Sequence, residues 1–191
     1  MKQFWFVIVS MLWFSIAIMG IEERSYTVVK TDGKIEIRDY QRVLSAEVIV
    51  QGERNSAASD AFRILFRFIQ GKNKSQMVIP MTAPVSQERL KGDTWYVRFF
   101  MPASMSLDQA PTPSDPRITI VEHESVRLGA IRFSGFSSQK NLKKHADKLR
   151  RYLTDKNILF VDSPMYAFYN APYVPPFFRR NEILFTIKEN N

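Results

Sequence analysis

Few residues of this chain could carry covalent or metal chemistry. The 191 residues contain no cysteine and two histidines, His123 and His145. The lack of cysteine excludes a disulfide scaffold, a cysteine nucleophile and any thiolate-ligated metal, and two histidines are too few for a multi-histidine metal cage. The sequence also lacks G-x-S-x-G, phosphate-loop, H-E-x-x-H and G-x-G-x-x-G motifs. The sequence therefore contains none of these common catalytic motifs.

Both histidines stand in surroundings typical of surface residues. His123 lies between Glu122 and Glu124 at the end of an expected strand, and His145 lies in a lysine-rich expected helix. A serine nucleophile needs an adjacent base, and the sequence shows no such pairing. We therefore expect a binding protein and not an enzyme. An enzyme that acts on a hydrophobic substrate through His123 is the weaker alternative.

Aromatic residues are numerous in this chain, and they could bind a ligand. The chain has 15 phenylalanines and 7 tyrosines, and several cluster near expected turns in the last third. These are Tyr166, Phe168, Tyr169, Tyr173, Phe177 and Phe178. Arg179 and Arg180 follow at once. An apolar wall with cations at its rim suits a flat, apolar ligand that carries carboxylates. Ordinary core packing accounts for the same aromatics equally well.

The formal net charge of +8 is concentrated in one expected helix. Residues 138–156 hold seven lysines and arginines against two aspartates. This pattern is typical of the solvated face of an amphipathic helix. Contact with an anionic membrane surface is a second interpretation. Nucleic acid is not an expected partner, because only one aromatic residue, Tyr152, stands among these cations.

The first twenty residues are expected to lie outside the folded domain. Residues 4–19 are apolar except for Ser10 and Ser15, with Lys2 before them and Glu22 and Glu23 after them. The segment is slightly short for a membrane span of about 20 residues and long for the apolar region of a cleaved signal. Residues 1–20 therefore predict a signal peptide cleaved near Gly20 or a single N-terminal membrane anchor. Residues 21–191 would then be an exported, periplasmic or otherwise extracytoplasmic domain.

The elements that must position the aromatic cluster follow from the hydrophobic pattern. Expected strands cover residues 26–30, 34–40, 43–50, 94–101, 117–121, 126–133, 166–173 and 182–188. Asp32 and Gly33 predict a hairpin turn between the first two. One helix is expected from Asn55 and Ser56, as caps, to Gly71, with an apolar stripe of Ala58, Phe62, Leu65, Phe66 and Ile69. A second follows caps at Ser137 and Ser138, with a stripe of Leu142, Ala146, Leu149 and Leu153.

The order strand–helix–strand–strand occurs twice, about eighty residues apart, which indicates an internal duplication. Each unit has a one-sided sheet and a helix, so the two can bury their apolar faces only against each other. The sequence therefore predicts a single α+β domain, a distorted antiparallel β-barrel built from two β-α-β-β repeats with two outer helices. We expect it to be a monomer.

Three motifs resemble the SOUL/haem-binding protein family. They are FIQGKNKSQMVIPMTAPV (residues 68–85), GFSSQKN (135–141) and YNAPYVPPFFRRNEI (169–183). Their order agrees with the family across nearly the whole exported domain, and the fold also resembles bacterial effector-binding domains. The resemblance implies a duplicated barrel and reversible binding of haem or a related tetrapyrrole, as a carrier, buffer or sensor.

The resemblance also implies where the ligand would bind. It places a shallow apolar surface beside the first helix and the loop before the last strand. The corresponding residues here are Ala58, Phe62, Arg63, Phe66, Tyr173, Val174, Phe177, Phe178, Arg179 and Arg180. Some members have a proposed histidine ligand where this chain has Asp39, so haem would be held without that axial bond, or through Tyr173 or a methionine. Met77 and Met81 are expected to be core residues. The alternative is a ligand-sensing or membrane-surface module that binds another apolar ligand.

Overall fold

The computed structural model describes residues 21–188. The expected signal peptide or anchor in residues 1–20 lies outside this range. Within the described range, no helix has both the length and the apolar character needed to cross a membrane.

The elements occur in the order β1 (Glu22–Glu23), β2 (Tyr26–Asp32), β3 (Ile35–Tyr40), β4 (Val43–Gln51), α1 (Arg54–Ile69), β5 (Thr82–Ala83), β6 (Val85–Lys91), β7 (Thr94–Phe100), β8 (Ile118–His123), β9 (Val126–Phe133), α2 (Gln139–Asp155), β10 (Met165–Phe168), the 3-10 turn η1 (Pro176–Phe178) and β11 (Asn181–Thr186). The predicted hairpin turn between the first two long strands is confirmed, but one residue later than expected: Asp32 pairs with Ile35, and Gly33, at a φ of 58°, and Lys34 form the turn.

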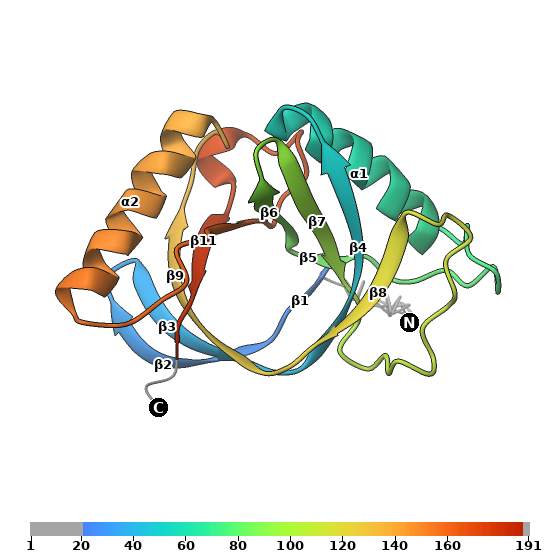
Figure 1. Cartoon of the computed structure of the whole chain (residues 1–191), viewed down its shortest axis with the longest axis horizontal. Coiled ribbons are helices and arrows are strands. Elements are labelled where there is room, and N and C mark those ends of the chain that lie inside the picture. Colours follow the sequence, from blue (N-terminus) through green and yellow to red (C-terminus); the bar gives the residue numbers. More distant parts are fainter. Residues whose placement is uncertain (1–20, 189–191) are drawn as a thin grey trace, which may run out of the picture.

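One antiparallel sheet of nine strands organises the described domain. Its order is β2-β3-β9-β11-β10-β6-β7-β4-β8, and β1 pairs separately with β5 in parallel. The sheet curls into a half-barrel, and both helices cover its convex face (Figure 1). Strands β10 and β6 pair at the centre, which joins a β4-α1-β6-β7 unit to a β9-α2-β10-β11 unit. The predicted α+β class and the duplicated β-α-β-β order are confirmed.

Each helix covers its own part of the core. Under α2 the predicted stripe is confirmed, since Leu142, Ala146, Leu149 and Leu153 are all buried. Ser138 caps this helix, as expected, by accepting a hydrogen bond from the Asn141 amide at 3.3 Å. The second repeat therefore follows its sequence pattern closely.

The apolar stripe predicted for α1 is buried at Leu65 and Ile69 and not at its other positions. The buried positions include Ala57, Ala61 and Phe68, whereas Phe62 and Phe66 are exposed. Apolar residues cover more than half of this helix's circumference, so periodicity cannot select the face that packs. Phe62 and Phe66, which belong to the predicted stripe and which the family resemblance places on a shallow apolar surface, lie on the outside of the helix.

The start of α1 also differs from the expectation. Asn55 and Ser56 were predicted as caps, but both already belong to the first turn. Glu53 is the cap, and its carboxylate accepts hydrogen bonds from the amides of Asn55 at 2.8 Å and Ser56 at 3.4 Å. A carboxylate is favourable here because the N-terminus of a helix carries partial positive charge.

Candidate functional site

The outer face of α1 presents a pair of stacked aromatic rings. Phe62 and Phe66 are one helical turn apart, with ring centroids 5.6 Å apart and planes inclined by 17°. Their exposed fractions are 41% and 39%. Ala58 lies half-buried one turn earlier on the same stripe, and Arg63 is exposed beside it in an ion pair with Asp60. This face offers a flat apolar surface with a cation at its edge.

A segment between α1 and β5 extends this apolar surface. Met77, Val78 and Met81 are exposed, the last at 36%, so the expectation that the two methionines are core residues was wrong. Ile79 alone turns inward and is buried. Met81 lines a small hollow together with Phe62 and Phe66. We call these three residues, with Met77 and Val78, the α1 surface.

A second exposed aromatic group lies on the loop before β11. Tyr173 is 88% exposed, and Phe177 and Phe178 are also exposed, with their rings 4.5 Å apart. Val174 is half-buried, and its carbonyl accepts a hydrogen bond from Nε of Arg179 at 2.7 Å. Arg179 thus holds the loop in shape.

Phe136 belongs to this loop surface, although sequence reasoning did not select it. It is exposed, and the Arg179 guanidinium lies 5.9 Å from its ring centroid. The signal was available, because a large aromatic residue between Gly135 and Ser137 in a turn has no core to enter. We call Phe136, Tyr173, Val174, Phe177, Phe178 and Arg179 the loop surface.

The turn that precedes α2 connects the start of α1 to the loop surface. Arg54, at the start of α1, donates a hydrogen bond to the Ser137 carbonyl, and the Gly135 amide donates to the Pro176 carbonyl at 2.8 Å. The turn thus links the first residue of α1 to the loop, near the top of the molecule in Figure 1. Within residues 21–188, no ring contact joins Phe62 or Phe66 directly to Phe177 or Phe178.

Arg180 points away from the loop surface, into the inner side of the sheet. Its Nη1 lies 2.6 Å from Glu23, its Nη2 lies 2.9 Å from Glu182, and its guanidinium covers the Tyr169 ring at 3.8 Å. Burial alone would lower the pKa of Arg180, but Glu182, Tyr169 and Glu23 raise it overall. Of the predicted rim cations, Arg63 and Arg179 are therefore at the surface and Arg180 is not.

A serine, a histidine and a glutamate meet on the concave side, which sequence reasoning missed. Ser45 Oγ lies 2.8 Å from His123 Nε2 and donates to Glu47 at 2.8 Å. His123 Nε2 also lies 2.7 Å from the same Glu47 oxygen. A nucleophilic relay needs the acid and the serine on opposite ring nitrogens, whereas both meet Nε2 here. Ser45 is also fully buried, so the group cannot act as such a relay in this geometry.

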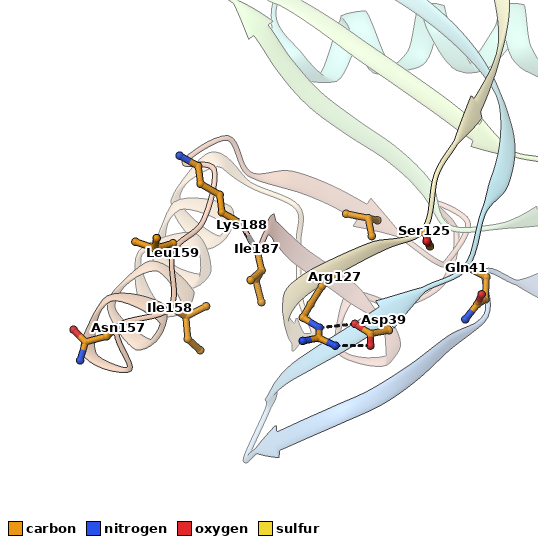
Figure 2. A pocket seen from close by; sticks show the side chains of 10 residues that line it. Asp39, Gln41, Ser125, Arg127, Asn157, Ile158, Leu159, Ile187 and Lys188 are labelled. Atoms are coloured by element: carbon orange, nitrogen blue, oxygen red, sulfur yellow. Dashed lines mark hydrogen bonds and ion pairs between the residues drawn. The ribbon is translucent and has the colours of Figure 1, made fainter. Parts of the chain in front are cut away.

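A cavity lies away from both aromatic surfaces. Its volume is about 690 Å³, and β3, β9, the segment after α2 and the chain beyond β11 line it (Figure 2). Asp39 and Arg127 form a two-pronged ion pair there at 2.6 and 2.7 Å, and Arg127 lowers the pKa of Asp39. Asp39 stands where the family resemblance places a histidine. None of the ten residues selected from the sequence lines this cavity.

Metal-binding groups of the usual protein type are not found in the described domain. Residues 21–188 contain no cluster of three or more histidine, cysteine or carboxylate side chains. Both histidines are engaged, His123 with Glu47 and His145 through Nδ1–H with the Asn141 carbonyl at 2.8 Å. The exposed side chains of the α1 surface and the loop surface can bind an apolar ligand and pair with its anionic groups at the edge.

Comparison of the sequence with known proteins finds relatives that are named as heme-binding proteins. The chain is 28% identical over 183 residues to heme-binding protein 1 of Xenopus tropicalis, covering 90% of this chain and 94% of that one. It is also 28% identical to heme-binding protein 2 of Mus musculus, covering 83% and 80%.

Solved structures extend the likeness at the level of the fold. The C-terminal domain of EcmrR matches with a TM-score of 0.60 at 12% identity, covering 86% of this chain and 99% of that one. The family model described as SOUL heme-binding protein matches residues 21–186. The chain therefore belongs to the SOUL heme-binding protein family.

Proposed function

We propose that this protein reversibly binds haem or a closely related tetrapyrrole, as a carrier, buffer or sensor. The observation that carries the proposal is the stacked, exposed pair Phe62 and Phe66 beside Met81. Large rings on a surface are costly to hydrate, and a flat apolar ligand covers them well. Membership of the family and the names of the sequence relatives support the same ligand class.

The residues at the proposed site fit the ligand. The α1 surface and the loop surface are apolar, and each has an exposed or half-exposed arginine, Arg63 and Arg179. Hydrogen bonds within residues 21–188 use Nε and Nη2 of Arg179, which leaves Nη1 to pair with a propionate. The iron would supply a Lewis-acidic centre when haem is bound, and this chain's residues would cover the ring and orient its carboxylates.

The expected affinity follows from the size of the ligand. Covering one face of a porphyrin removes a few hundred Å² of apolar surface from water, worth about 5–8 kcal/mol at ~25 cal/mol per Å². Association costs reduce this to micromolar affinity unless a bond to iron adds to it. Such an affinity suits a carrier, buffer or sensor, which must release its ligand.

A haemin titration tests the proposal. The full chain is titrated with haemin in a mild detergent, and the Soret absorption is followed. A saturable shift in the micromolar range is expected. If the Soret band does not shift in a saturable way by tens of micromolar, the proposal fails.

A second candidate function is a module that binds another apolar ligand or a membrane surface. The cavity of about 690 Å³ favours it, since this volume is within the ordinary range for small-molecule sites. Ile158, Leu159 and Ile187 give it an apolar side, and Lys188 lies beside them (Figure 2). This function predicts that anionic lipid vesicles bind the protein more tightly than haemin does.

We also propose that residues 1–20 export the domain, as a cleaved signal or as an anchor. The support is the apolar run between Lys2 and the two glutamates, Glu22 and Glu23. Fractionation of expressing cells, with N-terminal sequencing of the product, tests both forms. A product that starts near Ile21 identifies a signal, whereas an intact, membrane-bound chain identifies an anchor. An intact chain in the cytosol would contradict export.

A further inference from the structure

Met81 lies on the α1 surface in a position that its neighbours fix. The segment that carries it is held to the end of α1 by the buried Ile79, whose amide donates to the Ile69 carbonyl at 2.8 Å. The next residue after Met81, Thr82, is also buried, and its hydroxyl donates to the Phe100 carbonyl. Met81 is therefore an exposed side chain between two buried anchors, beside Phe62 and Phe66.

A buried asparagine holds the other end of this segment. Asn73 is 4% exposed, and its amide nitrogen donates to the carbonyls of Phe68 at 3.1 Å and Met77 at 2.7 Å. Its side-chain oxygen accepts a hydrogen bond from the Met77 amide at 3.0 Å. A side chain that satisfies three backbone groups makes this turn a fixed element and not a floppy loop. The exposure of the methionines is thus a built feature of the fold.

Other side chains that ligate haem iron are engaged or lie outside the α1 surface. His123 is bound to Glu47 and Ser45 on the concave side, and His145 is stacked on Phe133 with ring centroids 4.0 Å apart. Asp39 is paired with Arg127 at the cavity of Figure 2. Tyr173 is exposed, but it belongs to the loop surface. On the α1 surface itself, the candidate donors for iron are the thioethers of Met77 and Met81.

We infer that the thioether of Met81 is an axial ligand to the haem iron, and that this ligand makes binding sensitive to the redox state of the haem. The inference rests on the proposed haem-binding function and goes beyond it. Met81 is preferred to Met77 because Met81 lines the same hollow as the stacked rings. The rings would support the porphyrin plane while the sulfur approaches the metal.

The chemistry of sulfur determines the redox preference. A thioether is a soft, uncharged donor, and methionine ligation favours ferrous over ferric haem. The protein would then hold ferrous haem more tightly and release it more readily after oxidation. By linkage, a tenfold preference for the ferrous form raises the one-electron potential of the bound haem by about 59 mV. No electron has to come from the protein, since the preference is a difference between two binding constants.

Met81→Leu is the central variant, because leucine keeps the apolar volume and removes the sulfur. The wild-type full chain and the variant are titrated with three probes: ferric haemin, haem reduced with dithionite, and metal-free protoporphyrin IX. Met165→Leu is the matched control, as it removes a thioether from β10 at the centre of the sheet. Met77→Leu tests the competing donor on the same segment.

Met81→Leu is expected to weaken binding of ferrous haem about tenfold, with a matching fall of about 59 mV in the midpoint potential. Its affinity for protoporphyrin IX should stay within twofold of wild type, and Met165→Leu should match wild type with every probe. Equal spectra, potentials and ferrous affinities in wild type and Met81→Leu would overturn the inference, as would the full effect in Met77→Leu. If wild type binds neither haem nor protoporphyrin IX, the proposed function itself fails.

Discussion

Arg38 and Glu182 form a buried ion pair, with Nη1 of the arginine 2.6 Å from Oε2 of the glutamate. They lie on β3 and β11, the two strands that flank β9, and 144 residues separate them in sequence. The side chains are 3% and 0% exposed. Tyr40 and Tyr169 also bind these groups, at 3.0 Å from Arg38 and Glu182 respectively. The concave side of the half-barrel is thus held by charge and not only by apolar packing.

Glu182→Gln is expected to destabilise the fold strongly. The substitution leaves the buried guanidinium of Arg38 and that of Arg180 without their shared carboxylate. Breaking a buried pair from one side typically costs about 3–5 kcal/mol. Denaturant unfolding measures the loss, and Glu124→Gln is the control because its ion pair with Arg42 is exposed and worth less than about 1 kcal/mol. Equal losses in the two variants would contradict a stabilising role for the buried pair.

The same pair predicts a pH dependence of stability. Burial alone would raise the pKa of Glu182, but Arg38 and Arg180 lower it overall. A carboxyl with a lowered folded-state pKa contributes its stability above the unfolded value, and this is lost as the pH falls through the folded value. Wild type should therefore lose stability in acid, and Glu182→Gln should lose less over the same range. Parallel stability curves for the two proteins below pH ~4 would refute this linkage.

Charge substitutions can locate the proposed haem surface. Phe62→Asp places a carboxylate on the α1 surface, and Phe178→Asp does the same on the loop surface. Each should weaken haemin binding about tenfold or more, since an apolar contact is replaced by a group that must be desolvated. Leu90→Asp on β6 is the control, because Leu90 is also an exposed apolar residue and lies outside both surfaces.

The pattern of results in the Soret titration separates the possible locations. Loss in Phe62→Asp alone assigns binding to the α1 surface, and loss in both variants assigns it to both surfaces. If only a change in the cavity of Figure 2, such as Ile187→Asp, weakens binding, the assignment to the α1 and loop surfaces is wrong.

Gly129, on β9, lies where the sheet packs closely against Leu153 of α2. A Cβ at this position of β9 would lie 3.2 Å from Cδ2 of Leu153 and 3.4 Å from Cδ1. Gly129 is buried, and Leu153 is fully buried in the apolar cluster under α2. Gly129→Ala should therefore cost about 1–3 kcal/mol through overpacking.

A double-mutant cycle checks the cause of that loss. Leu153→Ala removes the clashing atoms at the expense of a cavity, with a loss of about 2–5 kcal/mol on its own. The double variant should lose less than the two single losses together, because the new methyl group enters the space that Leu153 leaves. Additive losses would show that the contact with Leu153 is not the reason why alanine at position 129 destabilises the fold.

Elements that are determined by residues close together in the sequence could be predicted. The stripe of α2 has one narrow apolar face, so its phase follows from spacing alone. The turn at Gly33 follows from its residue type. By contrast, β6 was not predicted, because VSQERLK is mostly polar and only its position between β7 and β10 makes it a strand. The duplicated order of the two repeats was nevertheless predicted.

The parts of the site that could not be predicted depend on pairing between distant strands. Ser45 meets His123 because β4 pairs with β8 in a register that sets Val43 opposite His123. Sequence spacing carries no information about that register. Arg180 was expected at the rim, yet alternation along a strand puts it on the same side as Glu182, two residues later. The buried partner, Glu182, thus decides where the arginine points.

His145 is expected to have a pKa below the ordinary histidine value. Burial lowers its pKa first, the hydrogen bond to the Asn141 carbonyl raises it, and Lys144, Lys148 and Lys34 lower it further. The ring also stacks on Phe133 with planes inclined by 10°. Protonation would place a further cation among three lysines, so the neutral ring is favoured in the folded state.

The sign of the effect on stability follows from linkage. The unfolded chain binds a proton near pH ~6.5, while the folded chain takes it up only at lower pH, so stability is lost as the pH falls below that value. NMR titration of the ring protons measures the folded pKa directly. Lys144→Gln should raise it, because one neighbouring cation is removed, whereas Lys74→Gln, in the turn after α1, should leave it unchanged. If neither variant moves the titration, the lysines of α2 do not control the protonation of His145, and burial against Phe133 alone accounts for its lowered pKa.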